Sequence, residues 1–456
     1  MCREREALSL RLGGVVPLIF TEIERHPVVA ELTRVAAAKD APKDEVEGMI
    51  RSVVSGIVDE AERFSLSGDL WNLFFALRLA GGENALGRAC ELTGPPRGSL
   101  ADIAPAELWG LLETLRSARE LARSRLSSFD CRFMERYVPS GRSAPFSPEV
   151  SDALSLLASR IGEARTPEAL MTAAVAFYRS MGSGFFGLYR AFHWSGDALA
   201  PIADVDPQTL DALIGYEEQK DALLANTRLF VSGEPANNVL LFGDSGTGKS
   251  SSVKALLNEP ELVRGGLRMI EVRKGRYGDL PDIVDATRGR NYRFILFLDD
   301  LSFEEFEVEY KYLKAVIEGG LERKPDNVVV YATSNRRNLV REVWSDRKAA
   351  SDDVHGGDTM QERHSLADRF GTTIWYGCVG KDRYMDMVRA LARARGIDMP
   401  EKELERLALR WELGRGAFTG RAARQFVFHL STDRRFGSRT VSEARRRDDE
   451  SIRREG

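Results

Sequence analysis

The chain has 456 residues, of which 43% are apolar and 29% are charged. This length and composition indicate a globular, water-soluble protein of two or three domains, and they exclude collagen-like, low-complexity and wholly disordered chains. The formal net charge of −4 excludes a strongly basic protein that binds nucleic acid or anionic lipid through its overall field.

Cysteine usage and hydropathy predict a cytoplasmic protein. The four cysteines (Cys2, Cys90, Cys131, Cys378) are too far apart for a metal site and too few for a disulfide framework. The apolar start of the chain is interrupted by Arg11 and lacks a small-residue cleavage site, which argues against a signal peptide. No apolar run approaches the roughly 20 residues that cross a bilayer, so we expect no membrane insertion.

The first part of the chain has a helical pattern. Apolar residues recur at spacings of three and four through residues 1–138, which predicts an N-terminal helical domain. Residues 139–148 are rich in Pro, Ser and Gly and are predicted to form a linker, and residues 149–205 a helical segment leading into the next domain. The run MGSGFFG, residues 181–187, matches the dinucleotide-binding pattern GxGxxG, but a helix-like run precedes it where a nicotinamide or flavin site needs a strand.

Farther along, strands and helices alternate. Near-continuous apolar runs such as NVLLFG and RFILFLDD are typical of parallel strands that are covered on both faces. We therefore predict an α/β domain over residues 206–380, followed by a helical lid over residues 381–432. The charged tail, residues 433–456, lacks an apolar period and is predicted to be disordered.

Residues 243–250 carry a phosphate-binding motif. Their sequence, GDSGTGKS, matches GxxxxGK[ST] in full and lies between an apolar strand and a helix, as this motif requires. The backbone N–H groups of such a loop point at phosphate oxygens, while Lys249 would reach the β and γ phosphates of ATP and Ser250 would bind Mg²⁺. The alternative is a glycine-rich turn that only joins strand to helix. The loop consists of Gly243, Asp244, Ser245, Gly246, Thr247, Gly248, Lys249 and Ser250.

Two acids close the strand FILFLDD. Asp299 and Asp300 lie at the carboxyl edge of a buried strand, where open α/β sheets bind their ligands. Asp299 suits the Mg²⁺ shell, and Asp300 suits a general-base or orienting role toward the water that attacks the γ-phosphorus. The alternative is a strand that is capped by two solvent-facing acids.

These motifs together resemble Walker A, Walker B and sensor 1 of the AAA+ ATPases, with sensor 1 in the strand that ends YATSN. The run IGYEEQKDAL, which begins with Ile214 and Gly215, resembles the segment that AAA+ proteins place beside the adenine. More closely, residues from about 170 to about 430 are similar to a bacterial ATP-binding family known as domain of unknown function 815. The resemblance implies a P-loop NTPase AAA+ core, in which a parallel five-stranded sheet lies between helices, with an N-terminal helical domain and a C-terminal helical lid.

The resemblance also implies roles for three residues outside the Walker motifs. Asn335 would be sensor 1, with a simple turn residue as the alternative. Arg369, in LADRFG, would be an arginine finger that a neighbouring subunit brings to the ATP, so a homo-oligomer is part of the expectation. A surface arginine paired with Asp368 is the alternative. Arg421 would be sensor 2, and Arg424, one helical turn away, is the alternative for that role.

Other features depart from the AAA+ pattern or stay outside it. Most members have Glu where Asp300 stands, so either the attacking water lies closer or hydrolysis is slow. Tyr277, in the loop GRYGD, is a candidate for the aromatic pore residue of protein-threading members, with a plain surface turn as the alternative. The acidic run between Glu304 and Glu309 is interpreted as a solvated helix face rather than a metal site beyond Mg²⁺.

The expected function is that of an ATPase that converts ATP to ADP and phosphate with Mg²⁺ between subunits and remodels a protein or nucleic-acid partner. The N-terminal helices would select that partner. The alternative is a nucleotide-gated scaffold with slow or incidental hydrolysis, for example a loader related to nucleic acid. A small-molecule kinase lacks visible acceptor residues, and a GTPase would need the NKxD motif, which the sequence lacks.

Overall fold

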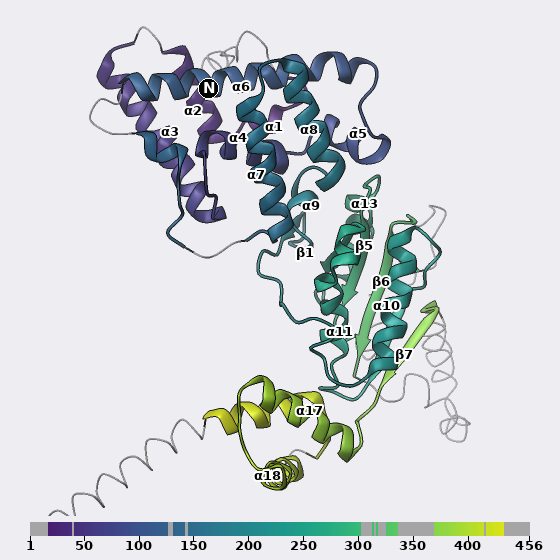
Figure 1. The fold of residues 1–456 in the computed structure, drawn as a ribbon. Coiled ribbons are helices and arrows are strands. Elements are labelled where there is room, and N and C mark those ends of the chain that lie inside the picture. Colours follow the sequence, from purple (N-terminus) through teal and green to yellow (C-terminus); the bar gives the residue numbers. More distant parts are fainter. Residues whose placement is uncertain are drawn as a thin grey trace, which may run out of the picture. The chain divides into compact units, whose positions relative to one another are not determined.

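The computed structural model describes residues 17–38, 41–125, 131–141, 145–301, 312–313, 316–317, 325–335, 369–414 and 416–432. The chain forms two compact units, coloured mainly purple to blue and mainly green to yellow in Figure 1. The first, which we call the helical unit, comprises Met1–Phe192 together with Ala200–Val205 and Gly289–Tyr292. The remainder of the chain forms the second, which we call the sheet unit.

The helical unit has one shared apolar core, which runs from Phe20 to Leu188 in the sequence. Its longer helices are amphipathic, as α3 shows by burying Val46, Ile50, Val53, Ile57 and Ala61 at spacings of three and four. Its helices are α1 (Thr21–Glu24), α2 (Pro27–Ala37), α3 (Lys43–Phe64), α4 (Leu70–Gly81), α5 (Ala85–Thr93), α6 (Ser99–Arg125), the 3₁₀ helix η1 (Cys131–Glu135), α7 (Pro148–Glu163), α8 (Pro167–Met181) and α9 (Phe185–Leu188).

Four of these helices begin at a side-chain cap. Asp69 and Asn84 accept backbone N–H groups in the first turns of α4 and α5, and Ser147 and Thr166 do the same for α7 and α8. Such caps satisfy N–H groups that have no partner within the helix. Proline follows the cap in α7 and α8, where its missing N–H costs nothing.

The linker predicted at residues 139–148 is wrong as a domain boundary. Phe146 is buried and stacks on Phe64, with ring centroids 5.3 Å apart, and it also packs on Tyr189. The helices that follow, α7 and α8, belong to the same core as α4 and α6. The composition was misleading because the Ser147 cap and the helix-starting proline resemble linker residues. Residues 142–144 lie outside the described residues.

The sheet has seven strands in the order β2-β1-β4-β5-β6-β3-β7. Five of them, β4, β5, β6, β3 and β7, are parallel to their neighbours, which confirms the predicted parallel sheet. The strands β1 and β2 lie in the segment 149–205, which was predicted as a helical segment with no strand; runs this short show no periodicity. The strands are β1 (Ala191–Trp194), β2 (Leu199–Pro201), β3 (Val239–Gly243), β4 (Leu267–Glu271), β5 (Arg293–Leu298), β6 (Val328–Ser334) and β7 (Thr372–Tyr376).

The register of the parallel strands brings their carboxyl ends to one edge. In the register, Val239 of β3 is opposite Tyr331 of β6 on one side and Thr372 of β7 on the other. All seven residues of β6 are buried. The Tyr331 hydroxyl bonds to both Asn226 and Thr227 at 2.9 Å, which fixes the helix α10 (Glu217–Ser232) on the sheet. The polar residues that follow β3, β5 and β6 therefore meet at the edge where ligands bind.

Helices surround the strands of the sheet unit and continue after them (Figure 1). The helices around the strands are α10 (Glu217–Ser232), α11 (Lys249–Ala255), the 3₁₀ helix η2 (Leu256–Asn258), α12 (Pro260–Arg264), the 3₁₀ helix η3 (Tyr277–Asp279) and α13 (Leu280–Thr287). After β7 come α17 (Lys381–Ala394), α18 (Glu401–Leu413) and a helix over residues 420–432, which together form the lid. Within the described residues, no helix is both long and apolar enough to span a bilayer.

Two expectations for loops of the sheet unit have different outcomes. Tyr277 is fully buried in the core, so neither a pore residue nor a plain surface turn describes it. The acidic run between Glu304 and Glu309 lies outside the described residues, as does the tail, residues 433–456.

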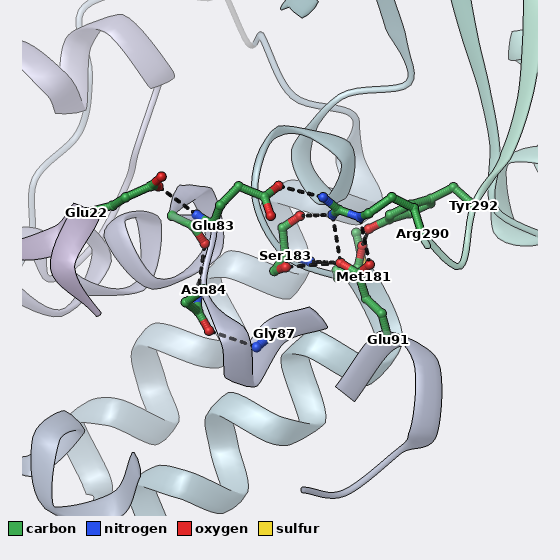
Figure 2. A network of polar contacts seen from close by, with 10 residues as sticks. Glu22, Glu83, Asn84, Gly87, Glu91, Met181, Ser183, Arg290 and Tyr292 are labelled. Carbon is green, nitrogen blue, oxygen red and sulfur yellow. Dashed lines mark hydrogen bonds and ion pairs between the residues drawn. The ribbon is translucent and has the colours of Figure 1, made fainter. Parts of the chain in front are cut away.

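The segment Gly289–Tyr292, between α13 and β5, belongs to the helical unit. Its Arg290 donates to Glu83 at 2.8 Å and to both carboxylate oxygens of Glu91, at 2.9 and 3.0 Å (Figure 2). The same guanidinium donates to the Ser183 carbonyl oxygen at 2.9 Å. Because the Arg290 and Glu91 side chains are only 7% and 3% exposed, this ion pair is nearly removed from water.

The glycines of MGSGFFG belong to this network rather than to a dinucleotide site. The Tyr292 hydroxyl donates to the Met181 carbonyl oxygen at 2.8 Å. A Cβ atom at Gly182 would lie 1.6 Å from that hydroxyl, and one at Gly184 would lie 2.0 Å from the Glu83 carboxylate. Both glycines also have positive φ, so the close approach and the backbone each require glycine.

Candidate nucleotide-binding site

The phosphate loop joins β3 to α11, which is the context that the motif predicts. Gly248 adopts φ +102° immediately before the first turn of α11, a conformation that glycine tolerates and other residues rarely adopt. The Thr247 hydroxyl donates to the Asp244 carbonyl oxygen at 2.8 Å and closes the loop on itself. The eight predicted residues thus run from the last residue of β3 through the turn into the first turn of α11.

Lys249 is buried within this loop. Its ammonium donates to the carbonyl oxygens of Gly243 at 3.1 Å and Asp244 at 2.7 Å. Burial lowers the pKa of Lys249 to about 8, against the charges of Asp244, Asp300 and Asp299, which raise it. The present acceptors of the ammonium are neutral, and the nearby acids favour its charged form. The ammonium can therefore exchange these acceptors for the oxygens of an anionic ligand.

The two acids after β5 lie against the phosphate loop. The Ser250 hydroxyl donates to Asp299 Oδ1 at 2.5 Å. The Asn335 amide donates to Asp300 Oδ1 at the same distance, so sensor 1 and the second acid of the sequence prediction are in contact. Asp300 itself has φ +55°, a left-handed conformation that is costly for a residue with a Cβ atom.

Thr333 is a site residue that the sequence analysis missed. Its hydroxyl donates to Asp299 Oδ1 at 2.7 Å and accepts the backbone N–H of Asp300 at 3.0 Å. Its carbonyl oxygen accepts the N–H of Leu301 at 2.6 Å. One threonine thus holds the turn that carries both acids. The period of two along β6 puts Thr333 on the same face as Asn335, and that alternation was the available signal.

The lid reaches the phosphate loop through Arg421. The N–H of Arg421 donates to the Gly246 carbonyl oxygen at 3.0 Å, and its positive charge contributes to the lowered pKa of Lys249. Arg424 instead lines the cleft beside the loop, with Nη1 at 3.4 Å from Gln208 Oε1. This placement separates the two arginines that the sequence left as alternatives: Arg421 lies at the phosphate loop.

A cleft lies beside the loop, between the segment before α10 and the lid. Its lining mixes apolar side chains with polar and backbone groups, as the lining of a small-molecule site does. Ile214 and Gly215 line it as predicted, and Tyr216 adds an aromatic ring that the prediction did not include. The lining residues are Gln208, Ala212, Leu213, Ile214, Gly215, Tyr216, Thr247, Gly248, Ser252, Met387, Leu391, Gly420 and Arg424.

Arg369 lies apart from these residues in the chain, three positions before β7, and is partly exposed. The next residue, Phe370, is buried and anchors this segment. The neighbouring loop, residues 336–368, lies outside the described residues, and so does Asp368.

Residues 187–434 match the model of the family described as "Protein of unknown function (DUF815)". The chain belongs to this family. The phosphate loop, the parallel strands and the acids after β5 give the sheet unit of this DUF815 protein the arrangement that the sequence predicts for an AAA+ fold. No curated protein matches the chain.

Solved structures of RuvB from Thermotoga maritima resemble part of this DUF815 protein. The Holliday junction branch migration motor itself and a variant with one threonine replaced by valine are both 18% identical to it, with TM-scores of 0.34 and 0.35. A variant with one lysine replaced by arginine is 17% identical, with a TM-score of 0.35. The first two matches cover 50% of this chain, which spans 65% of the RuvB length.

The residues of the site fit a magnesium nucleotide. Ser250 and Asp299 bring a hydroxyl and a carboxylate oxygen together, and Mg²⁺ prefers oxygen ligands of this kind. Lys249 and the main chain of the loop supply the positive charge and donors that phosphates require. The cleft beside the loop offers apolar and polar groups next to the phosphate positions, where a nucleoside would lie.

Proposed function

We propose that this protein hydrolyses ATP with Mg²⁺ between subunits of a homo-oligomer and uses the cycle to remodel a protein or nucleic-acid partner. The observation that carries the proposal is the contact of Ser250 with Asp299 beside Lys249 and Asp300, because metal, phosphate and water positions then lie next to one another.

Each site residue has a role in this proposal. Ser250 and Asp299 would hold Mg²⁺, which when bound neutralises phosphate charge and orients the leaving group. Lys249 and Arg421 stabilise the negative charge on the phosphates. Asp300 orients the attacking water and accepts its proton, and Asn335 holds the Asp300 carboxylate in place through its 2.5 Å bond.

Arg369 completes the site in trans. An arginine finger stabilises the transition-state charge and contributes roughly 10³ to 10⁵ in rate, but only where a second subunit brings it to the ATP. Hydrolysis should therefore depend on assembly.

A phosphate-release assay on the full chain tests the proposal. We expect steady release by the wild type and loss of most activity in both Asp300→Asn and Arg369→Ala. The matched control is Arg410→Ala, an exposed arginine of α18, which should keep its activity. Wild-type rates in both site variants would contradict the proposal.

The second candidate function is a nucleotide-gated scaffold in which ATP stabilises one assembly and turnover is incidental. The observation that favours it is Asp300, which is one methylene shorter than Glu and already bonded to Asn335. A scaffold would assemble with ATP and show equally little phosphate release in the wild type and in Asp300→Asn. A remodelling ATPase would instead retain its partner on co-purification when Asp300→Asn is held in ATP.

A further inference from the structure

The second residue of the phosphate loop, Asp244, forms hydrogen bonds in two directions. Its carbonyl oxygen accepts from Lys249 Nζ at 2.7 Å and from the Thr247 hydroxyl at 2.8 Å, within the loop. Its N–H donates to the Tyr376 carbonyl oxygen at 2.9 Å, and its Oδ2 accepts the N–H of Cys378 at 2.7 Å. The second pair joins the loop to the last residue of β7 and to the chain that follows β7.

That following chain, residues 377–380, links β7 to α17, and we call it the lid connector. The Gly377 carbonyl oxygen accepts the Tyr216 hydroxyl at 2.7 Å, at the cleft. The Val379 N–H donates to the Phe418 carbonyl oxygen at 3.2 Å, in the lid. The connector is therefore bonded to the cleft, to the lid and, through Asp244, to the phosphate loop.

The charge of Asp244 has an electrostatic cost. A carboxylate in a loop that receives phosphates repels them, whereas Asn or Ser would form the same turn without that repulsion. A hydrogen bond to a carboxylate is about twice as strong as one to a neutral acceptor. The strong hydrogen bond that the Cys378 N–H donates to the Asp244 carboxylate compensates for this electrostatic repulsion. Burial lowers the pKa of Lys249, and Asp244 is the strongest of the charges that oppose this effect.

We propose that Asp244 is a positioning residue whose carboxylate ties the phosphate loop to the lid connector, so that the loop and the lid change position together. When Lys249 turns from the Asp244 carbonyl oxygen toward a phosphate, that oxygen loses one of its two hydrogen bonds, and residue 244 can shift together with Cys378, to which its carboxylate is bonded. The hydrogen bond between Asp244 and Cys378 forms without a ligand. Only the joint movement of loop and lid rests on the proposed function.

Hydrogen exchange on the full chain without nucleotide tests the tie. In Asp244→Ala the amides of the lid connector should exchange about ten- to a hundredfold faster, which is the loss expected for one hydrogen bond to a carboxylate. The matched control is Asp282→Ala, an exposed aspartate of α13, which should leave these amides unchanged. Wild-type exchange of the connector in Asp244→Ala would overturn the inference.

The coupling is tested by adding ADP and Mg²⁺ to the same proteins. In the wild type, exchange should slow in the phosphate loop and change in α17 and α18. In Asp244→Ala the loop should still be protected, but the response of the lid should be lost; a full lid response would overturn the coupling. If the wild-type loop shows no protection, the proposed function fails, while the nucleotide-free comparison still decides the tie.

The variant Asp244→Asn keeps an acceptor and loses the charge. If Asp244→Ala does not fold, this variant replaces it, with an expected increase in connector exchange of roughly threefold to tenfold, between wild type and full loss. Exchange equal to that of the wild type in Asp244→Asn would show that the charge has no part in the tie and would overturn the inference.

Discussion

Lys249 is the residue on which binding of a phosphate ligand depends most directly. Its ammonium donates to two carbonyl oxygens among the described residues, at 3.1 and 2.7 Å, and burial lowers its pKa to about 8. A phosphate would supply negative charge at hydrogen-bond distance from the buried ammonium. Ligand binding and protonation of this amine are therefore linked.

This linkage predicts a pH dependence. Above pH 8 the free protein holds Lys249 mostly neutral, and since the bound triphosphate favours the charged form, binding takes up a proton. Affinity for ATP and Mg²⁺ should fall by up to about tenfold per pH unit between about pH 8 and pH 9.5. Calorimetry in two buffers of different ionisation enthalpy measures both effects.

The control for this prediction is Lys249→Arg, because arginine stays charged throughout this range. Any binding by that variant should not vary between about pH 7.5 and 9.5. An affinity of the wild type that is constant over the same range, with no dependence on buffer, would contradict the assignment of Lys249.

Thr333 should act through Asp299, the acid that we propose as a Mg²⁺ ligand. Its hydroxyl orients Asp299 and satisfies the N–H of Asp300, which stands in a left-handed conformation. Thr333→Val should lower the affinity of the nucleotide complex for Mg²⁺ by about ten- to a hundredfold, as loss of outer-shell partners does elsewhere. Thr333→Ser retains the hydroxyl and should remain within about threefold of the wild type. Titration of Mg²⁺ at fixed ATP measures this, and equal effects of Val and Ser would refute the role.

The sequence was sufficient to predict the place of residues that belong to contiguous motifs. The phosphate loop and the acid pair at Asp299 and Asp300 were found because each motif is contiguous and its chemistry depends on spacing. Thr333 and Tyr216 were missed because their roles depend on which strands and connectors lie beside them. The alternation along β6 puts Thr333 on the face of Asn335, but it does not mark this threonine as the partner of acids that lie 33 and 34 residues earlier in the chain.

At the level of elements, the contact between the phosphate loop and the lid requires glycine on the loop side. A Cβ atom at Gly246 would lie 2.9 Å from the Cβ of Arg421 and 3.4 Å from the Thr419 hydroxyl. At Gly248, which also has positive φ, an added Cβ would meet nothing within 4 Å. Substitutions at the two glycines therefore distinguish the effect of backbone strain from the effect of contact with the lid.

We expect Gly246→Ala to displace the start of the helix over residues 420–432. Amides of that helix should exchange faster in nucleotide-free Gly246→Ala than in Gly248→Ala, although both variants carry the strain of a left-handed alanine, about 1–2 kcal/mol. Hydrogen exchange of the two variants gives the comparison. Equal exchange in this helix would mean that the lid does not rest on the loop.

Element prediction succeeded where periodicity was long and failed where it was short. The strands β3, β5 and β6 were identifiable because five to seven successive residues are mostly apolar and buried. The strands β1 and β2 have four and three residues and no pattern to recognise. The supposed linker failed because composition does not show that Phe146 is buried.

At the scale of the whole molecule, the segment between α13 and β5 belongs to the helical unit, whereas the chain before and after it belongs to the sheet unit. Arg288 and Arg293 belong to the sheet unit, and Gly289–Tyr292 belong to the helical unit. The charged residue of this segment is Arg290. Its guanidinium also lies 4.7 Å from the Phe186 ring centroid. The strand that follows it, β5, leads directly to the acids of the site.

Removing Arg290 should be costly because it leaves Glu91 buried and unpaired. We expect Arg290→Met to lower the free energy of unfolding by about 3–5 kcal/mol. Arg290→Met combined with Glu91→Gln should cost less than the sum of the single changes, because no buried charge remains. Denaturation of the four proteins of this cycle measures the coupling, and additive costs would contradict it.

The control is Arg288→Ala, which removes an exposed pair with Asp285 and should change stability by less than about 1 kcal/mol. A loss of stability comparable to that of Arg290→Met would show that burial of the ion pair does not determine the loss.

The central claim is that the loop around Lys249, with Ser250 and Asp299, holds one magnesium triphosphate. Isothermal titration of the folded full chain with ATP and Mg²⁺ tests it most directly. We predict one saturable site per chain in the wild type and no measurable binding in folded Lys249→Ala. A folded wild type that shows neither heat nor saturation, or a Lys249→Ala variant that binds as tightly, would contradict the account.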